Sequence, residues 1–208
     1  MGRVRRILAA GIEVGEPAWV SDGKRLAIGL VGKFNTMTDT LNIDVERLID
    51  APSITAGAAK RDITPPVEVG LLMSSVDGRW MPFEGVRQEL FARAIVLRGR
   101  SASGAIERVA IVSLDLLALS GEALGGFAEF KSRIAAAAGN SVHAHEIVLS
   151  CTHTHSAPES GALTDLYRTP DYAGWLHYLI LQIGQAIQAA YASGVPCQLS
   201  YGTAPAGG

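Results

Sequence analysis

The chain has 208 residues, of which 48% are hydrophobic and 18% are charged, and its formal net charge is −2 at pH 7. This composition is that of a soluble globular protein with enough length for one domain to one and a half. The small charge gives no electrostatic basis for binding nucleic acid or an acidic membrane surface. The two cysteines, Cys151 and Cys197, are no disulfide framework.

Targeting signals are absent from the sequence as it stands. Met1 to Arg6 resembles the basic start of a signal peptide, but the apolar run from Ile7 to Ala10 is too short before Glu13. No run is long enough for a transmembrane span. The sequence therefore offers no export signal, which by itself favours a cytoplasmic location and leaves the localisation open.

The first part of the chain carries no motif. Leu26 to Val31 is strand-like, Asp44 to Ile49 has the pattern of a short helix, and Ala51 to Ser53 is typical of a linker. We therefore treat residues 1–52 as an unassigned N-terminal segment and residues 53–208 as the domain that carries function.

Strands and helices alternate in the second part. The apolar runs are typical of strands buried on both faces, and the helical segments begin at capping residues. In chain order we expect strands at Ala94 to Leu97 and Val109 to Leu114, a helix from Gly121 to Ala138 capped by Ser120, a strand at Glu146 to Cys151, a long helix opening at Thr169-Pro-Asp171 and ending before Gly194 and Pro196, and a strand at Gln198 to Tyr201. This order predicts an α/β fold with a largely parallel or mixed sheet flanked by helices.

The segment Ser150-Cys-Thr-His-Thr-His-Ser-Ala-Pro158 holds two histidines behind an apolar strand. Alternate residues of a strand face the same side, so His153 and His155 would project together, and neutral imidazole is a common zinc ligand. A pair of surface or hydrogen-bonded histidines remains the alternative. His143 and His145 precede the strand, about 25 Å away at ~3.3 Å per residue, and ligands of such sheets gather at the carboxyl ends of strands.

Two other side chains near this motif have open roles. Asp115 ends the strand at Val109 to Leu114 and would lie at the same sheet edge, where it either orients a histidine or a water or caps a loop. Cys151 is either a nucleophile or, as we favour, a small buried strand residue.

Four segments occur in the order of a known family. They are Ala56-Gly-Ala-Ala-Lys-Arg-Asp-Ile-Thr-Pro-Pro66, Gly85 to Val96, Val109 to Asp115 and Thr152-His-Thr-His-Ser156. Together they resemble the N-terminal catalytic domain of the neutral/alkaline, non-lysosomal ceramidases. The resemblance implies a zinc-dependent hydrolase that cleaves the amide of N-acylsphingosine, a lipid amide, to sphingosine and a fatty acid. It maps a zinc ligand onto His153 and makes His155 a residue that lines the site. If the full site exists, His155 is our candidate for the acid that returns a proton to the leaving amine. Bacterial relatives are often secreted.

The departures from this family leave two interpretations open. Arg87 stands where relatives commonly carry a histidine, and the family's further ligands, a histidine, a glutamate and a tyrosine, fall beyond the point corresponding to Gly208. A catalytic zinc site needs about three protein ligands. The chain is then either an incomplete domain of a longer enzyme, or a truncated, inactive unit that serves folding or interaction. An incomplete sheet would also leave an exposed edge through which we expect self-association.

Overall fold

The computed structural model describes residues 44–47, 54–66, 72–74, 80–82, 85–101 and 103–203. The chain divides into two compact units, residues 1–53 with 197–208, and residues 54–196. The strand expected at Leu26 to Val31 and the linker at Ala51 to Ser53 lie outside the described residues. The second unit contains all the candidate site residues.

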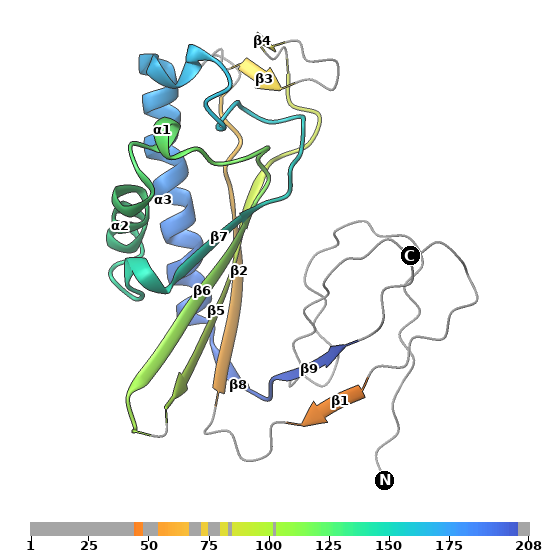
Figure 1. Cartoon of the computed structure of the whole chain (residues 1–208), viewed down its shortest axis with the longest axis vertical. Helices are drawn as coiled ribbons and strands as arrows, with labels where there is room; N and C mark the ends of the chain where they lie inside the picture. Colours follow the sequence, from red (N-terminus) through yellow and green to blue (C-terminus); the bar gives the residue numbers. More distant parts are fainter. Residues whose placement is uncertain are drawn as a thin grey trace, which may run out of the picture. The chain divides into compact units, whose positions relative to one another are not determined.

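The elements confirm an α/β fold, drawn in Figure 1. The strands are β1 (Asp44–Arg47), β2 (Ile54–Asp62), β3 (Leu72–Ser74), β4 (Trp80–Pro82), β5 (Phe91–Arg100), β6 (Ile106–Leu114), β7 (Ile147–Cys151), β8 (Val195–Cys197) and β9 (Ser200–Thr203). The α-helices are α1 (Gly121–Leu124), α2 (Phe127–Ala137) and α3 (Pro170–Ala192), and short 3₁₀ helices are η2 (Ala144–Glu146) and η3 (Asp165–Arg168). No helix among these described residues has the length and apolar character needed to cross a membrane.

The main sheet has five strands in the order β7-β6-β5-β2-β8 and is mixed. β5 pairs antiparallel with both β2 and β6, whereas β6 and β7 are parallel. The expectation of a largely parallel sheet is therefore wrong, and the mixed alternative is correct. The short connection over residues 101–105 permits only a hairpin, while the stretch holding α1 and α2 is long enough for a parallel crossover.

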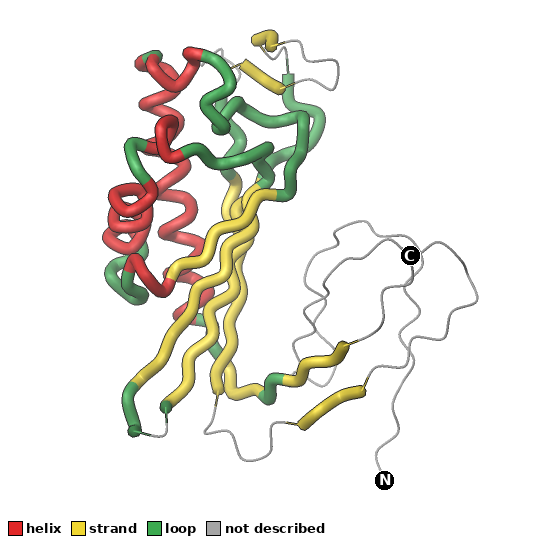
Figure 2. The backbone as a smooth tube through the Cα atoms, viewed as in Figure 1, coloured by secondary structure: helices red, strands yellow, loops and turns green. Residues whose placement is uncertain are grey.

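The helices lie along one face of this sheet, as Figure 2 shows. Residues facing them are buried, for example Ala94 and Val96 at 1% exposed, but Ile111 is 36% and Val148 50% exposed on the other face. The strands are thus not buried on both faces as expected, because no helix of the described residues covers the second face.

The sequence signals for the starts of α1 and α3 are confirmed. Ser120 caps α1 by accepting a hydrogen bond from the backbone of Glu122, and Thr169 caps α3 with Pro170 in its first turn. The single helix expected from Gly121 to Ala138 is instead broken at Gly125 and Gly126, whose φ angles are +74° and +97°. Left-handed backbone ends a helix, and glycine adopts it without a steric penalty.

Long-range pairing corrects three local expectations. Asp44–Arg47 forms strand β1 against β9 in place of a helix. A segment of four residues is too short for its apolar pattern to distinguish a helix from a strand. β7 begins at Ile147, after Glu146 has ended η2. The strand expected at Gln198 to Tyr201 begins only at Ser200, as part of β9, because residues 198–199 lie between β8 and β9, which pair in different sheets.

The core lies between α2, α3 and the sheet. Its large, fully buried side chains each stabilise the fold by about 1.5–3 kcal/mol relative to exposure. They include Phe130 and Ile134 of α2, Leu179, Ile183 and Ile187 of α3, and Leu114 and Ile147 of the sheet.

Candidate functional site

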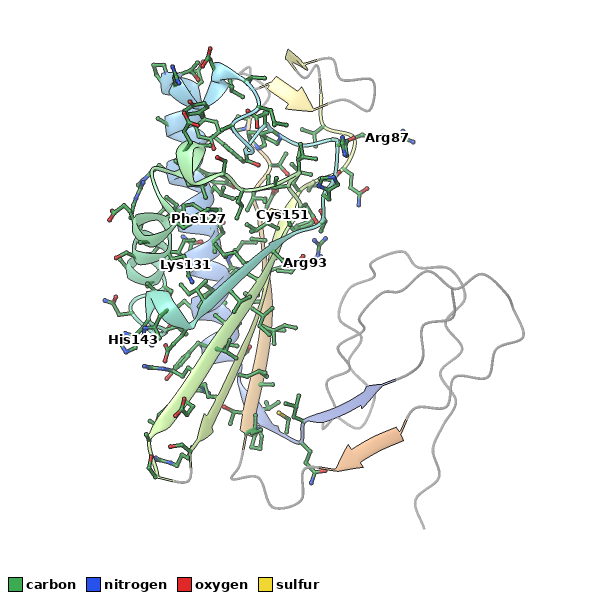
Figure 3. All side chains as sticks on the ribbon, in the orientation of Figure 1. Arg87, Arg93, Phe127, Lys131, His143 and Cys151 are labelled. Atoms are coloured by element: carbon green, nitrogen blue, oxygen red, sulfur yellow. The ribbon has the colours of Figure 1, made fainter. Side chains whose placement is uncertain are left out.

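The carboxyl ends of β6 and β7 lie side by side, because the two strands are parallel and Leu114 is paired with Cys151. Asp115 follows β6, and His153 and His155 follow β7. His143 and His145 flank and join η2 at the other end of β7, so the two histidine pairs lie at opposite ends of this strand, as expected. Figure 3 labels His143 and Cys151, which mark the two ends.

His153 does not continue the strand. Its φ angle is +62°, in the left-handed region that non-glycine residues seldom adopt. The argument that strand alternation turns both histidines to one face is therefore wrong, since β7 ends at Cys151. The rings of His153 and His155 nevertheless approach, with centroids 5.0 Å apart and planes at 88°. Strain of this kind costs about 1–3 kcal/mol and persists only where the surroundings impose it.

Those surroundings are the backbone of the loop that follows β6. The N–H of Thr152 donates to the oxygen of Leu114 over 2.9 Å, and the N–H of His153 donates to the oxygen of Leu116 over 3.0 Å. The parallel pairing of β6 and β7 thus continues past the strand ends and holds His153 in place.

The imidazole of His153 is also fixed by this loop. Its Nδ1 lies 2.9 Å from the backbone oxygen of Leu117. A carbonyl only accepts, so Nδ1 carries a proton, and in the neutral ring Nε2 then has the lone pair. Metal-binding histidines usually donate one ring N–H to a carbonyl or carboxylate in this way. His153 as a whole residue is exposed.

The carboxylate of Asp115 binds groups of β5 and not the two histidines. Its carboxylate accepts from Arg93 Nη1 at 2.7 and 2.8 Å and from the N–H of Phe91 at 2.9 Å. Within the part of the chain that the structure describes, it makes no hydrogen bond to His153 or His155. The carbonyl of Leu117 takes the orienting role that sequence reasoning offered to Asp115. Asp115 instead joins the ends of β5 and β6.

A buried glutamate in the loop after His155 escaped the sequence analysis. The carboxylate of Glu159 is fully buried and accepts from the N–H of Gly161 (2.5 Å) and from the N–H (3.3 Å) and hydroxyl (3.2 Å) of Thr164. Pro158 and Gly161 signal a turn, but burial of a carboxylate cannot be read from that signal. Glu159 therefore folds the loop around itself.

This loop is tied to the one that holds His153. The hydroxyl of Ser160 donates to the oxygen of Ala118 over 2.5 Å, and the N–H of Ser120 donates to the oxygen of Ser160 over 3.1 Å. Nearby, the Tyr172 hydroxyl is buried without a hydrogen-bond partner among the described residues, and burial followed by the charge of Glu159 raises its pKa.

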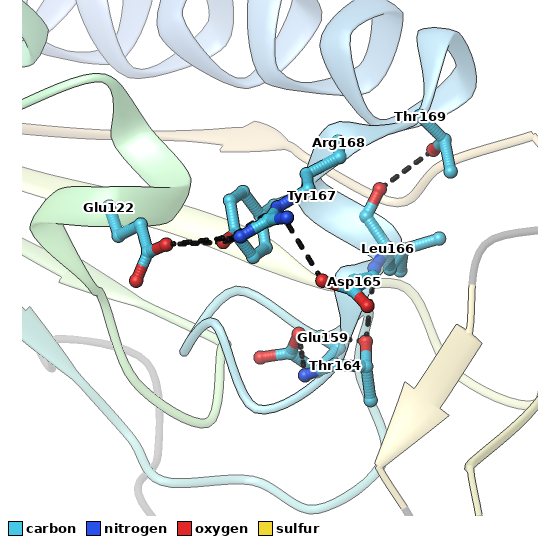
Figure 4. A network of polar contacts seen from close by, with 8 residues as sticks. All are labelled: Glu122, Glu159, Thr164, Asp165, Leu166, Tyr167, Arg168 and Thr169. Atoms are coloured by element: carbon cyan, nitrogen blue, oxygen red, sulfur yellow. Dashed lines mark hydrogen bonds and ion pairs between the residues drawn. The ribbon is translucent and has the colours of Figure 1, made fainter.

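A polar cluster holds the far end of the same loop, as Figure 4 shows. The hydroxyl of Tyr167 donates to Glu122, and Arg168 donates to that hydroxyl over 2.8 and 3.0 Å. The ion pair between Arg168 and Glu122 is about 65% exposed on both sides, so it contributes little to stability. It connects η3 to α1.

The remaining candidates add no metal ligand. Arg87, labelled in Figure 3, is exposed on the segment leading into β5, and a guanidinium does not bind metal. Burial raises the pKa of the Cys151 thiol to about 11, which argues against a nucleophile and for the small strand residue we favoured. Over the described ranges, no three His, Cys, Asp or Glu side chains form a group that could hold a metal ion. The described residues therefore provide one histidine whose ring is oriented for metal binding, His153, with His155 beside it.

Comparisons with known proteins leave the family open. No protein-family model matches the chain, and no curated protein matches its sequence significantly. The resemblance to ceramidases therefore depends on the four motif segments alone.

Proposed function

We propose that the chain carries part of the active site of a zinc-dependent amide hydrolase of the ceramidase type, which converts an N-acylsphingosine to sphingosine and a fatty acid. The observation that supports this most is the contact between His153 Nδ1 and the oxygen of Leu117. It prepares Nε2 of an exposed histidine as a ligand, at the sheet edge where ligands of α/β folds gather. The four motif segments supply the substrate class.

Each site residue then has a distinct role. A bound zinc would supply an activated water and polarise the amide carbonyl. His153 would hold the ion through Nε2, and the resemblance to the ceramidases implies further ligands, a histidine, a glutamate and a tyrosine, beyond the point corresponding to Gly208. His155, whose ring lies 5.0 Å from that of His153, would take the proton that the attacking water releases and pass it to the leaving amine. Asp115 and Arg93 keep the strand ends together without touching the substrate.

A second candidate function is that of an inactive unit that serves only folding or interaction. It is favoured by the ligand count, because the described part of the chain offers no group of three ligands. A site with two histidines lacks the donors that give zinc its usual affinity. Under either function we expect the chain by itself to bind zinc weakly and to hydrolyse amides slowly or not at all.

Zinc titration calorimetry on the chain and its His153→Ala variant tests the ligand assignment. His145→Ala is the matched control, since it removes an exposed histidine at the other end of β7. We expect weak binding that disappears in His153→Ala and survives in the control. Equal binding in all three proteins would refute His153 as a ligand, and tight stoichiometric binding lost only in His153→Ala would show a complete site in this chain.

The reaction is tested separately. Hydrolysis of a fluorescent N-acylsphingosine and of a simple N-acyl amine is followed with and without a chelator. The assay is run on this chain and, separately, on a form of the protein that extends past Gly208. Chelator-sensitive cleavage of the sphingosine amide would support the proposal. Cleavage that a chelator does not affect would remove zinc from it, and cleavage of the simple amide alone would remove the lipid.

A further inference from the structure

Within the described part of the chain, no strand pairs with the outer side of β7. β7 is the outer strand of the five-stranded sheet, and β6 is its neighbour. The N–H of Thr152 points to β6, where it bonds the oxygen of Leu114, and successive N–H groups of a strand point to opposite sides. The N–H groups of Cys151 and Leu149 therefore point outward. That of Ile147 is already bonded to the oxygen of Ala144.

The two edges of this sheet differ in the residues that block pairing with a further strand. β8, the opposite outer strand, carries Pro196, which has no N–H to donate. β7 reads Ile-Val-Leu-Ser-Cys and has neither proline nor lysine, the residues that usually block an edge against another strand. Val148 is 50% exposed on it. The edge of β7 therefore carries none of these blocking residues, whereas β8 carries one.

A groove of about 650 Å³ runs along the open edge. β7 forms one wall, the loop Leu117 to Leu119 closes one end, and Phe127 and Lys131 of α2 form the other wall. Figure 3 shows Phe127 and Lys131 on α2 and Cys151 at the end of β7. Phe127 is 49% exposed, so it offers apolar surface. Lys131 is the single charged side chain of this lining.

We propose that the edge of β7 accepts an extended peptide strand of a partner polypeptide, with alternating apolar residues and an acidic side chain opposite Lys131. Only a strand supplies acceptors for the outward N–H groups of Leu149 and Cys151 and places side chains in the groove at the same time. An acyl chain would leave those groups unsatisfied. The self-association expected from the sequence fits this edge less well, because a second copy pairing through its own β7 brings another Lys131 and no acidic side chain from the groove lining. This inference does not depend on the proposed amide hydrolysis.

The test uses blocked synthetic peptides and amide signals in NMR. The probe alternates valine and threonine and has one central glutamate; a second peptide has lysine in its place, and a third has proline at alternate positions. We expect the glutamate peptide to slow hydrogen exchange at Leu149 and Cys151, and the proline peptide to have no effect. Lys131→Glu should reverse the preference between the glutamate and lysine peptides, by about 2- to 5-fold for a rim charge. Arg133→Glu, the same change on α2 outside the groove lining, is the control and should leave the preference unchanged.

Three results would overturn the proposal. The first is unchanged exchange at Leu149 and Cys151 with every peptide. The second is protection of both amides that grows with protein concentration in the absence of peptide, which would make a second copy the occupant. The third is saturable binding of decanoate in the groove while the glutamate peptide fails to bind. Thermal unfolding of Lys131→Glu and Arg133→Glu verifies that each variant is folded. A change in peptide preference can then be attributed to the substituted charge and not to unfolding.

Discussion

Arg93 and Asp115 bridge the ends of two neighbouring strands, with Nη1 of Arg93 2.8 Å from Oδ1 and 2.7 Å from Oδ2 of the carboxylate. The same carboxylate accepts from the N–H of Phe91 at the start of β5. It therefore fastens the sheet at the end from which the loop holding His153 departs.

Asp115→Asn should reduce the free energy of unfolding by about 1–3 kcal/mol, because a partly buried charge-assisted pair is lost. Urea unfolding measures this change. Asp165→Asn, which removes an ion pair on the exposed surface, is the matched control and should have no measurable effect. The ¹⁵N shifts of the His153 ring should stay those of an Nδ1–H imidazole in Asp115→Asn. A change of tautomer there would mean that Asp115 orients His153 after all.

Glu146 makes the free energy of unfolding depend on pH in the acidic range. Burial acts to raise the pKa of its carboxyl, but hydrogen bonds from the N–H of His143 and from Arg108 outweigh it and lower the pKa below its ordinary 4.5. A depressed pKa contributes stability above the unfolded value, and this contribution is lost as pH falls below 4.5 through the folded pKa.

Glu146→Gln should therefore be less stable than the unmodified chain at pH 7, and the difference should shrink toward zero as pH falls from 4.5 to the acid limit. Denaturant unfolding at a series of pH values measures it, with Glu129→Gln, an exposed change on α2, as control. A difference that stays constant with pH would show that the carboxylate charge is not the cause.

Cys151 should react slowly with alkylating agents. Burial raises the pKa of its thiol to about 11, so at pH 8 only about one thiol in a thousand is ionised. The rate of iodoacetamide labelling, followed by peptide mass spectrometry, should rise about tenfold per pH unit toward pH 11. In urea the same cysteine should react fast. Rapid labelling of the folded chain at pH 7 would contradict the buried environment and reopen Cys151 as a nucleophile.

Gly184 of α3 lies close against Ala137 of α2. An added Cβ would come within 2.5 Å of the Cβ and 2.7 Å of the carbonyl carbon of Ala137, both closer than real contacts allow. Gly184→Ala should therefore destabilise the fold by about 1–3 kcal/mol through overpacking. Gly174→Ala on the same helix meets nothing within 4 Å and should stabilise it by about 0.5–1 kcal/mol, because alanine favours helix. Thermal unfolding compares the two; equal shifts would refute the close approach.

Local signals predicted the elements near the site well. Ser120 and Thr169-Pro170 mark helix starts because their side chains and fixed backbone angles act within one turn. The break at Gly125 and Gly126 was missed, although two adjacent glycines are themselves a stop signal. The directions of the strands were not predictable from apolar runs, since a run has the same pattern whether its neighbour is parallel or antiparallel.

The sequence by itself determined that β7 ends just before His153 and His155, and that His143 and His145 lie at its other end, because these relations depend only on order along one strand. Tertiary structure alone decided the orientation of His153, since its ring bonds to Leu117, 36 residues earlier in the chain. It also decided the burial of Glu159 and the open edge of β7. These features arise where separate segments meet, and a local pattern holds no record of which groups will face one another.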